Sequence, residues 1–316
     1  MEQKIYSLII AKMKKMSVQV STDMAFSELT TLGCGGKIRI TVFPDSEQKL
    51  VKCVRFFDKL KVTYFMLGKG SNVLASDDDF DGVVVATKRL ANFRISGRFA
   101  YAQCGVSTVT LGSALRDKGL TGGEFLACLP ATVGGAIVTN AGCYGQEAKD
   151  IICGVKALYR GKICHFSAKK CAFGKRTSFF AKNNDVVILS VKLKFNRSNS
   201  QTVDELIKEM RAKKSATQPL NFRSAGSALY HDKVAVSRLI DMAGLKGYTV
   251  GGAQVSTKHA GFVINIDKAT SKDIYLLIRH MQMTLRRRFG IDAKIEIRLI
   301  NFNEDTKDSD DVFTDG

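Results

Sequence analysis

Apolar residues recur every three or four positions in several stretches, which is the spacing of one face of a helix. The first clear stripe consists of Leu50, Cys53, Val54 and Phe57. Asp45 with Gln48 predicts a capping box at the start of this helix. Further helices are predicted over residues 109–118, 203–214 and 234–243. Residues 1–24 are predicted to form a loosely attached lead-in helix.

The longest helical stripe lies near the end of the chain and consists of Ile274, Leu277, Ile278, Met281 and Leu285. Thr270 and Ser271 are suitable residues for its start, and Gly290 for its end. The helix is followed by strict alternation over residues 293–300, which predicts a strand with Glu296 on its polar face. Other strands are predicted at 37–43, 62–66, 83–86, 155–159, 186–195 and 261–266, and a second subdomain is predicted to begin at residues 99–105.

A stretch rich in glycine and other small residues, E-F-L-A-C-L-P-A-T-V-G-G-A-I-V-T-N-A-G-C-Y-G, occupies residues 124–145. Glycine lets a ligand approach the backbone closely, and consecutive N–H groups beside a helix start form an anion site. We interpret this stretch as a backbone cradle for a diphosphate, named here the second cradle. The alternative is a tight turn between two core elements.

A first cradle lies upstream, at residues 67–74, with the sequence L-G-K-G-S-N-V-L. It is not a phosphate-binding Walker loop, because Thr63 and Gly70 stand where that motif needs Gly and Ser or Thr. It is not a Rossmann loop either, because Val73 replaces the third glycine. Two cradles, each beside apolar runs, favour one large cofactor held between two subdomains.

Size and charge leave the general class open. The chain has 316 residues, 25% charged and 45% hydrophobic, which suits a globular protein of two or three domains. Its net charge of +18 is spread along the sequence, and no nucleic-acid-binding motif is visible, so nucleic acid is not an expected partner. A positive field would attract a small anionic substrate.

Eight cysteines form no C-x-x-C pair and four histidines are isolated, so no metal site is predicted. The thiols are expected to be reduced, as in a cytoplasmic protein. The apolar run at residues 6–11 is too short for a membrane span. We therefore expect a cytoplasmic monomer without membrane insertion.

The order of the motifs points to a known family. The two cradles are followed by G-K-R-T-S at residues 174–178, P-L-N-F-R-S-A-G-S at 219–227 and G-G-A-Q-V-S-T-K-H-A-G-F-V-I-N at 251–265. This combination resembles the UDP-N-acetylenolpyruvoylglucosamine reductases, which belong to the vanillyl-alcohol-oxidase/PCMH-type FAD-binding superfamily. The resemblance covers residues 26–300.

The resemblance implies an α+β fold, in which a two-subdomain PCMH-type FAD-binding domain precedes a smaller α/β substrate-binding domain of the reductase's second structural subtype. The expected segments are a lead-in helix (1–25), two FAD-binding subdomains (26–97 and 98–200), the substrate-binding domain (201–300) and a disordered acidic tail (301–316).

The resemblance also implies a reaction of cell-wall synthesis. NADPH reduces a non-covalently bound FAD, and the enolpyruvyl double bond of UDP-N-acetylglucosamine enolpyruvate then receives the hydride. Ser227 matches the family's proton donor, Arg176 its carboxylate-stabilising arginine, and Glu296 its catalytic glutamate. Without the family match, Ser227 would be read as a turn residue, Arg176 as a surface side chain, and Glu296 as a salt-bridge partner of its strand neighbours.

The same match assigns the binding residues. The cofactor would contact Leu67, Gly68, Lys69, Gly70, Ser71, Asn72, Pro130, Ala131, Thr132, Gly134, Gly135, Ala136, Asn140 and Gly142. The UDP-sugar would contact Lys175, Lys214, Tyr230, His231 and His259.

Several positions depart from the family pattern. Lys175 replaces a tyrosine before the arginine, Tyr230 and His231 replace a lysine and an asparagine, and Lys294 replaces a glutamate. We hypothesise that Lys175, Lys213, Lys214 and His231 share the task of binding the diphosphate.

Two alternatives remain. The first is an FAD-dependent oxidase of the same superfamily that acts on an alcohol or sugar. Many such oxidases attach FAD covalently through a histidine of the first cradle, and neither cradle here contains one. The second is a basic nucleic-acid-binding protein, which would be colourless and bind in a salt-dependent way.

Overall fold

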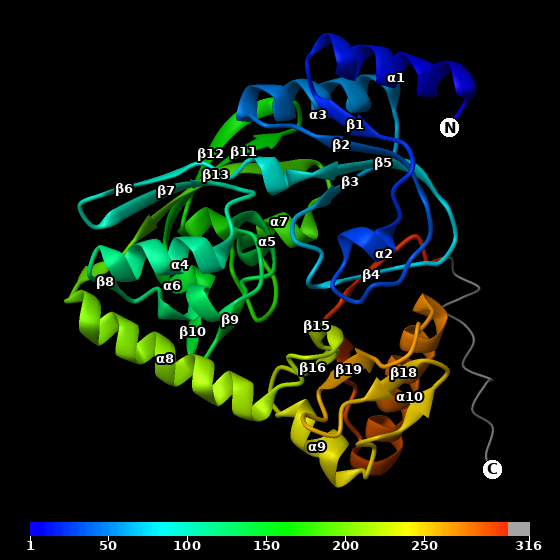
Figure 1. The fold of residues 1–316 in the computed structure, drawn as a ribbon, viewed down its shortest axis with the longest axis vertical. Helices are drawn as coiled ribbons and strands as arrows, with labels where there is room; N and C mark the ends of the chain where they lie inside the picture. The colour runs from blue at the N-terminus through cyan, green and yellow to red at the C-terminus, as the bar shows by residue number, and fades with distance from the viewer. Residues whose placement is uncertain (303–316) are drawn as a thin grey trace. The chain divides into compact units, whose positions relative to one another are not determined.

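The computed structural model describes residues 1–302. The chain divides into two compact units, each assembled from several segments (Figure 1). Unit 1 comprises Met1–Thr22, Ile40–Lys69 and Asp81–Lys214, and unit 2 comprises Asp23–Arg39, Gly70–Phe80 and Ser215 onwards. The first cradle therefore contributes residues to both units.

Helices and strands are interspersed along the chain. The helices are α1 (Gln3–Lys15), α2 (Phe26–Leu29), α3 (Glu47–Leu60), α4 (Thr108–Asp117), α5 (Val133–Val138), α6 (Ala148–Ile151), α7 (Phe179–Lys182), α8 (Ser200–Thr217), α9 (Val236–Met242) and α10 (Ser271–Phe289). Short 3-10 helices are η1 (Thr87–Arg89), η2 (Glu124–Cys128) and η3 (Lys169–Cys171).

The strands are short. The first group is β1 (Gln19–Ser21), β2 (Ile38–Phe43), β3 (Tyr64–Leu67), β4 (Val73–Ala75), β5 (Phe80–Ala86), β6 (Phe93–Ser96), β7 (Phe99–Gln103), β8 (Leu120–Thr121), β9 (Gly142–Cys143), β10 (Gln146–Glu147), β11 (Ile152–Tyr159) and β12 (Lys162–Ser167). The second group is β13 (Val186–Lys194), β14 (Asn196–Arg197), β15 (Arg223–Ser227), β16 (Leu229–Tyr230), β17 (Thr249–Val250), β18 (Ala253–Val255), β19 (Phe262–Asn265), β20 (Lys294–Ile295) and β21 (Arg298–Ile300).

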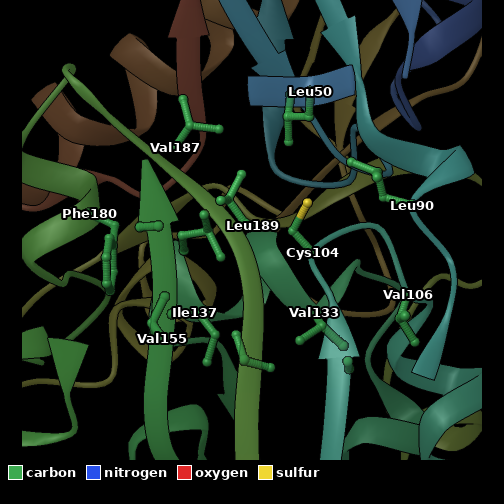
Figure 2. Close-up of a cluster of buried hydrophobic side chains, with 14 of the residues drawn as sticks. Leu50, Leu90, Cys104, Val106, Val133, Ile137, Val155, Phe180, Val187 and Leu189 are labelled. Carbon is green, nitrogen blue, oxygen red and sulfur yellow. The ribbon is translucent and has the colours of Figure 1, made fainter. Parts of the chain in front are cut away.

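Unit 1 is built on two sheets. One has the strand order β1-β2-β5-β3, with β3 and β5 parallel, and the other has the antiparallel order β12-β11-β13-β7-β6. Their apolar faces share one core, part of which is shown in Figure 2. In that core Val133 and Ile137 of α5 lie beside Cys104 and Leu189, so the second cradle rests on packed side chains. Small residues allow this close approach.

The N-terminal helix is firmly packed, and the expectation of a loosely attached helix was wrong. Ile9 and Met13 of α1 are fully buried in the core of unit 1. The Met13 and Cys53 sulfur atoms lie 3.5 Å apart, which places α1 against α3, as Figure 1 also shows. Burying two large apolar side chains stabilises this contact by about 1.5–3 kcal/mol each.

Helix α3 buries the stripe that its sequence predicts, but its cap differs. Leu50, Cys53 and Phe57 are fully buried. Ser46, not Asp45, is the N-cap, and its hydroxyl accepts a hydrogen bond from the Lys49 N–H at 3.3 Å. Asp45 instead forms an ion pair with the Lys49 ammonium at 3.0 Å.

Unit 2 has a four-stranded antiparallel sheet in the order β15-β19-β18-β17, against which α10 packs. The α10 residues Ile274, Leu277, Ile278, Met281 and Leu285 are all fully buried in the core of this unit, as their spacing predicts. Thr270 caps the helix and Gly290 ends it in a left-handed conformation with φ 64°.

The single strand predicted over residues 293–300 is two short strands. β20 pairs antiparallel with β16, and β21 pairs in parallel with β4. The backbone changes partner at Glu296 and Ile297. The predicted faces are nonetheless correct, since Ala293 and Ile297 are buried whereas Lys294 and Arg298 are exposed.

Residues 303–316, which make up most of the predicted acidic tail, lie outside the described residues. Asn301 and Phe302, placed in that tail by the prediction, are described. The Phe302 ring packs 5.2 Å from the ring of Tyr275. The predicted domain boundaries remain predictions.

Candidate active site

The two cradles meet within unit 1. Strand β3 ends at Leu67, and an added Cβ at the following Gly68 would overlap the hydroxyl oxygen of Thr132 in the second cradle. Thr132 is itself the N-cap of α5 and accepts a hydrogen bond from the Gly135 N–H at 3.3 Å. Glycine at position 68 is therefore required by the close approach of the two predicted cradles.

The N–H groups at the start of α5 are already used, contrary to the expectation of an anion site there. The Val133 N–H donates to the Val106 carbonyl and the Gly134 N–H to the Cys104 carbonyl, both at 2.8 Å. With the Gly135 N–H bound to Thr132, the first turn has no donor left for a ligand. Pro130 and Gly135 lie exposed at the surface of the second cradle, and Ala131 is partly exposed.

Available donors lie instead in the first cradle. Among residues 1–302, no protein acceptor is found for the backbone N–H groups of Lys69, Gly70, Ser71 and Asn72. Gly70 has φ 69°, a left-handed conformation that glycine adopts without strain. Consecutive unpaired N–H groups around such a residue bind anions well, so this segment fits the diphosphate of a dinucleotide.

Asn140 has a structural part in the second cradle. It is fully buried, and its amide donates to a Glu147 carboxylate oxygen and to the Gly174 carbonyl, both at 3.0 Å. Its carbonyl oxygen accepts from the Lys149 N–H at 3.0 Å. Asn140 thereby fixes the turn that carries Arg176.

Residues around that turn also affect the pKa of Glu147. Burial would raise the pKa of Glu147, but the Lys149 ammonium, the Asn140 amide and the Arg176 charge together lower it. Arg176 has φ 54°, and Gly174 and Thr177 pair across it. The neighbouring Lys175 is exposed.

Helix α8 brings two basic side chains to carbonyl groups in the first part of the second cradle. Lys214 donates to the Cys128 carbonyl at 2.5 Å, and Arg211 to the Ala127 carbonyl at 3.4 Å. Burial lowers the pKa of Lys214, and the charge of Lys69 lowers it further. Lys214 and Lys69 thus lie near one another inside unit 1, as a phosphate-binding pair would.

Ser227 lies at a bulge in unit 2. The register between β15 and β19 shifts between Ser224 and Ser227, and Gly226 has φ 80°. The Ser227 hydroxyl is partly buried and forms no hydrogen bond to any other residue in the described range. An uncommitted hydroxyl held on a rigid strand end is suited to donate a proton to a ligand.

Glu296 lies directly beside this strand end. Its N–H donates to the carbonyl of Ala228 at 2.8 Å, and its own carbonyl accepts from the Asn72 amide at 3.1 Å. Residues directly opposite in antiparallel strands share one face of the sheet. The backbone therefore holds Glu296 against Ala228, the residue that follows Ser227.

The next residues along β16 and β20 form a polar group. Tyr230 lies opposite Lys294, whose ammonium is 5.9 Å from the Tyr230 ring and 3.2 Å from Asp232. The hydrogen bond that the Lys294 ammonium donates to the Asp232 carboxylate raises the pKa of Lys294. His231 accepts a hydrogen bond from the Lys233 N–H at 3.2 Å. No local sequence pattern predicts that Asp232 and Lys294 pair, because 62 positions separate them.

His259 is partly buried in the loop between β18 and β19. Its Nδ1 accepts from the Gly261 N–H at 3.1 Å, and its ring packs edge-on against Phe262 at 4.9 Å. Burial lowers the pKa of His259, so the ring is neutral at pH 7 with its proton on Nε2. The remaining Nε2–H can donate to an uncharged substrate oxygen.

The structure therefore groups the predicted residues by unit. Arg176, Lys175, Lys214 and most of the two cradles belong to unit 1, and Ser227, Glu296, Asn72, Tyr230, His231 and His259 belong to unit 2. Across residues 1–302, no cluster of His, Cys, Asp and Glu could hold a metal ion. In the same range no helix is long and apolar enough to span a membrane.

Comparisons with known proteins agree with this arrangement. A family model for an FAD binding domain matches residues 38–167, and a model for the C-terminal domain of UDP-N-acetylenolpyruvoylglucosamine reductase matches residues 218–300. The reductase of Caldanaerobacter subterraneus subsp. tengcongensis is 33% identical over 273 residues, covering 86% of this chain and 90% of the relative. That of Clostridium botulinum strain Alaska E43 is 33% identical over 301 residues, covering 95% and 98%.

The fold of this chain also resembles that of a solved reductase structure. The crystal structure of the reductase from Thermus caldophilus has a TM-score of 0.78 and 26% identity, covering 90% of this chain and 99% of that one. The fold and the first cradle define the class: the chain is an FAD-dependent flavoprotein oxidoreductase. Within that class, it belongs to the UDP-N-acetylenolpyruvoylglucosamine reductase family. The predicted order of an FAD-binding domain and a reductase C-terminal domain is confirmed.

Proposed function

We propose that this chain catalyses the NADPH-dependent, FAD-mediated reduction of UDP-N-acetylglucosamine enolpyruvate to UDP-N-acetylmuramate, a step of peptidoglycan precursor synthesis. Its family membership supports the reaction. The observation that carries the assignment of roles is the backbone hydrogen bond from the Glu296 N–H to the carbonyl of Ala228, the residue that follows Ser227.

The backbone donors of residues 69–72 would hold the diphosphate of the cofactor. When bound, FAD supplies two-electron chemistry, accepting a hydride from NADPH and delivering it to the enolpyruvyl double bond. The glycines at positions 68 and 70 leave room for a large group against the backbone.

The protein's own contribution is charge and protons. Hydride addition to the enolpyruvyl group leaves an enolate-like dianion on the substrate. Arg176 would bind its carboxylate, because a guanidinium stays charged and presents a fork of donors. Ser227 would give its proton to the adjacent carbon, and Glu296 beside it would assist as a second donor.

Each unit carries side chains that suit a part of the substrate. Lys214 and Lys69 of unit 1 supply positive charge for the diphosphate, with exposed Lys175 nearby in sequence. Tyr230, His231 and His259 of unit 2 supply hydrogen-bonding groups for the sugar.

The test is an anaerobic absorbance spectrum of the purified protein, followed by NADPH and then by the enolpyruvyl UDP-sugar. We expect a flavin spectrum that bleaches with NADPH and recovers only when the sugar is added. Recovery with oxygen but not with the sugar would point to an oxidase. A protein that neither contains nor takes up FAD would contradict the proposal.

A further inference from the structure

Asn72 belongs to the first cradle, yet its side chain contacts the strand that carries Glu296. The Asn72 amide donates to the Glu296 carbonyl at 3.1 Å. The Asn72 carbonyl accepts from the Arg298 N–H, also at 3.1 Å. One residue of the cradle thus holds positions 296 and 298 of the chain from one side, within unit 2.

The contact falls where regular pairing is interrupted. β20 ends at Ile295 on its partner β16, and β21 begins at Arg298 on its partner β4. The Glu296 carbonyl therefore receives no ladder hydrogen bond from either sheet. The Asn72 amide supplies the missing donor, and an unsatisfied buried carbonyl costs about 1–3 kcal/mol.

The other side of Glu296 is held by the strand of Ser227. The Glu296 N–H donates to Ala228, the residue that follows Ser227. The two backbone groups of Glu296 are thus taken by the cradle on one side and by the proton-donor strand on the other. The arrangement is anchored by the parallel ladder in which Val73 lies opposite Arg298 and Ala75 opposite Ile300.

We propose that Asn72 is a positioning residue, whose amide sets the backbone of Glu296 and so aims its carboxyl group beside Ser227. This role is additional to the backbone donors that the cradle offers to a cofactor. The inference rests on the proposed function, because it requires that Glu296 acts in the protonation step. It predicts that loss of the Asn72 amide affects protonation and leaves FAD binding intact.

The experiment compares Asn72→Ala and Asn72→Asp with Asn92→Ala, which removes an exposed asparagine side chain outside both cradles. Asn72→Asp is close in shape but removes the donor, so it serves if the alanine variant folds poorly. FAD content, the rate of bleaching by NADPH and the rate of recovery with the UDP-sugar are measured anaerobically. Hydrogen exchange of residues 294–298 gives a readout independent of activity.

We expect both Asn72 variants to retain FAD and to bleach normally, while recovery slows about 10- to 100-fold, which is less than the roughly 10²–10⁴-fold contribution of a complete acid–base group because Glu296 itself remains. Exchange at residues 294–298 should be faster in both Asn72 variants and unchanged in Asn92→Ala. In a Glu296→Gln background, Asn72→Ala should slow recovery less than about twofold further, since coupled residues are not additive.

The following results would contradict the positioning role of Asn72. Normal recovery in both Asn72 variants, or the same slowing with and without Glu296, would show that Asn72 does not act through Glu296. Loss of FAD with normal recovery after reconstitution would reduce Asn72 to a cofactor contact. If Glu296→Gln itself recovers at the normal rate, the role of Glu296 in the proposed function fails, and this inference fails with it.

Discussion

The candidate proton donor illustrates how backbone geometry can prepare a weak acid. A serine hydroxyl gives up its proton only to a strongly basic atom that is already in place. Ser227 meets the geometric part of that requirement, because the bulge at Gly226 fixes the strand end and its hydroxyl is not committed elsewhere in the described chain. Glu296 is held beside it by the Ala228 carbonyl.

Replacing Ser227 by alanine should therefore affect one half of the reaction. We expect Ser227→Ala to slow recovery of the flavin spectrum by roughly 10²–10⁴-fold, the usual contribution of an acid or base, with bleaching by NADPH unchanged. Stopped-flow absorbance of the two half-reactions measures this. Ser224→Ala on the same strand is the control, and equal rates for the two variants would remove Ser227 from the mechanism.

The sequence identified many of these residues through their motifs but could not show what they contact. Asn140 was expected to touch the cofactor, whereas both amide hydrogens and the carbonyl oxygen of its side chain are bound within the protein. Likewise, the backbone N–H groups at the start of α5, which the sequence suggested were available to a ligand, donate to the carbonyls of Val106 and Cys104. Such partners are set by tertiary packing, which local sequence does not reveal.

The environment of Asn140 leads to a stability prediction. Asn140→Ala leaves the Gly174 carbonyl and the Lys149 N–H without partners, and each unsatisfied buried group costs about 1–3 kcal/mol. We expect a lower unfolding midpoint in urea and slower turnover even though Arg176 remains. Exposed Asn92→Ala is the control. An unchanged midpoint would contradict the structural role assigned to this side chain.

Among the helices and strands, the sequence correctly predicted the buried face of a helix where a single apolar stripe packs on a single core. The apolar faces of α3 and α10 are those expected from their spacing. The predicted N-cap of α3 was wrong by one residue. Asp45 and Ser46 are both good capping residues, and the backbone conformation before the helix decides which of them caps it. The prediction also missed β6 and β12, whose residues alternate between partly buried and exposed positions.

The cap at the N-terminus of α10 can be tested by mutation. Thr270 accepts from the Asp273 N–H at 3.0 Å, and Asp273 accepts from the Thr270 N–H at 2.9 Å, which completes a capping box. Thr270→Ala should lower the free energy of unfolding by about 1 kcal/mol. Thermal unfolding monitored by circular dichroism measures the change. The exposed Lys272→Ala should leave the midpoint unaltered, and a similar shift in both variants would argue against the cap.

For the whole molecule, the sequence predicted the kinds of elements better than their partners. The parallel pairing of β4 with β21 joins residues 73–75 to residues 298–300, and no local pattern links them. This pairing nevertheless places the first cradle beside Glu296 within unit 2. Long-range pairing is thus the part of the site that required the structure.

Two histidines make stability depend on pH. Burial lowers the pKa of His259 and of His280, whose ring stacks 4.3 Å from Tyr248. A group whose pKa is lower when folded binds protons more readily when unfolded. Its contribution is therefore complete above the unfolded value, about 6.5, and is lost as pH falls towards the folded pKa.

We expect the urea midpoint to fall as pH is lowered from about 7 to 5, since each histidine contributes at most about 1.4 kcal/mol per pH unit. His280→Gln should make this dependence shallower, because one of the two titrating rings is removed. Equal slopes for the wild-type protein and His280→Gln would show that His280 titrates alike in the folded and unfolded states.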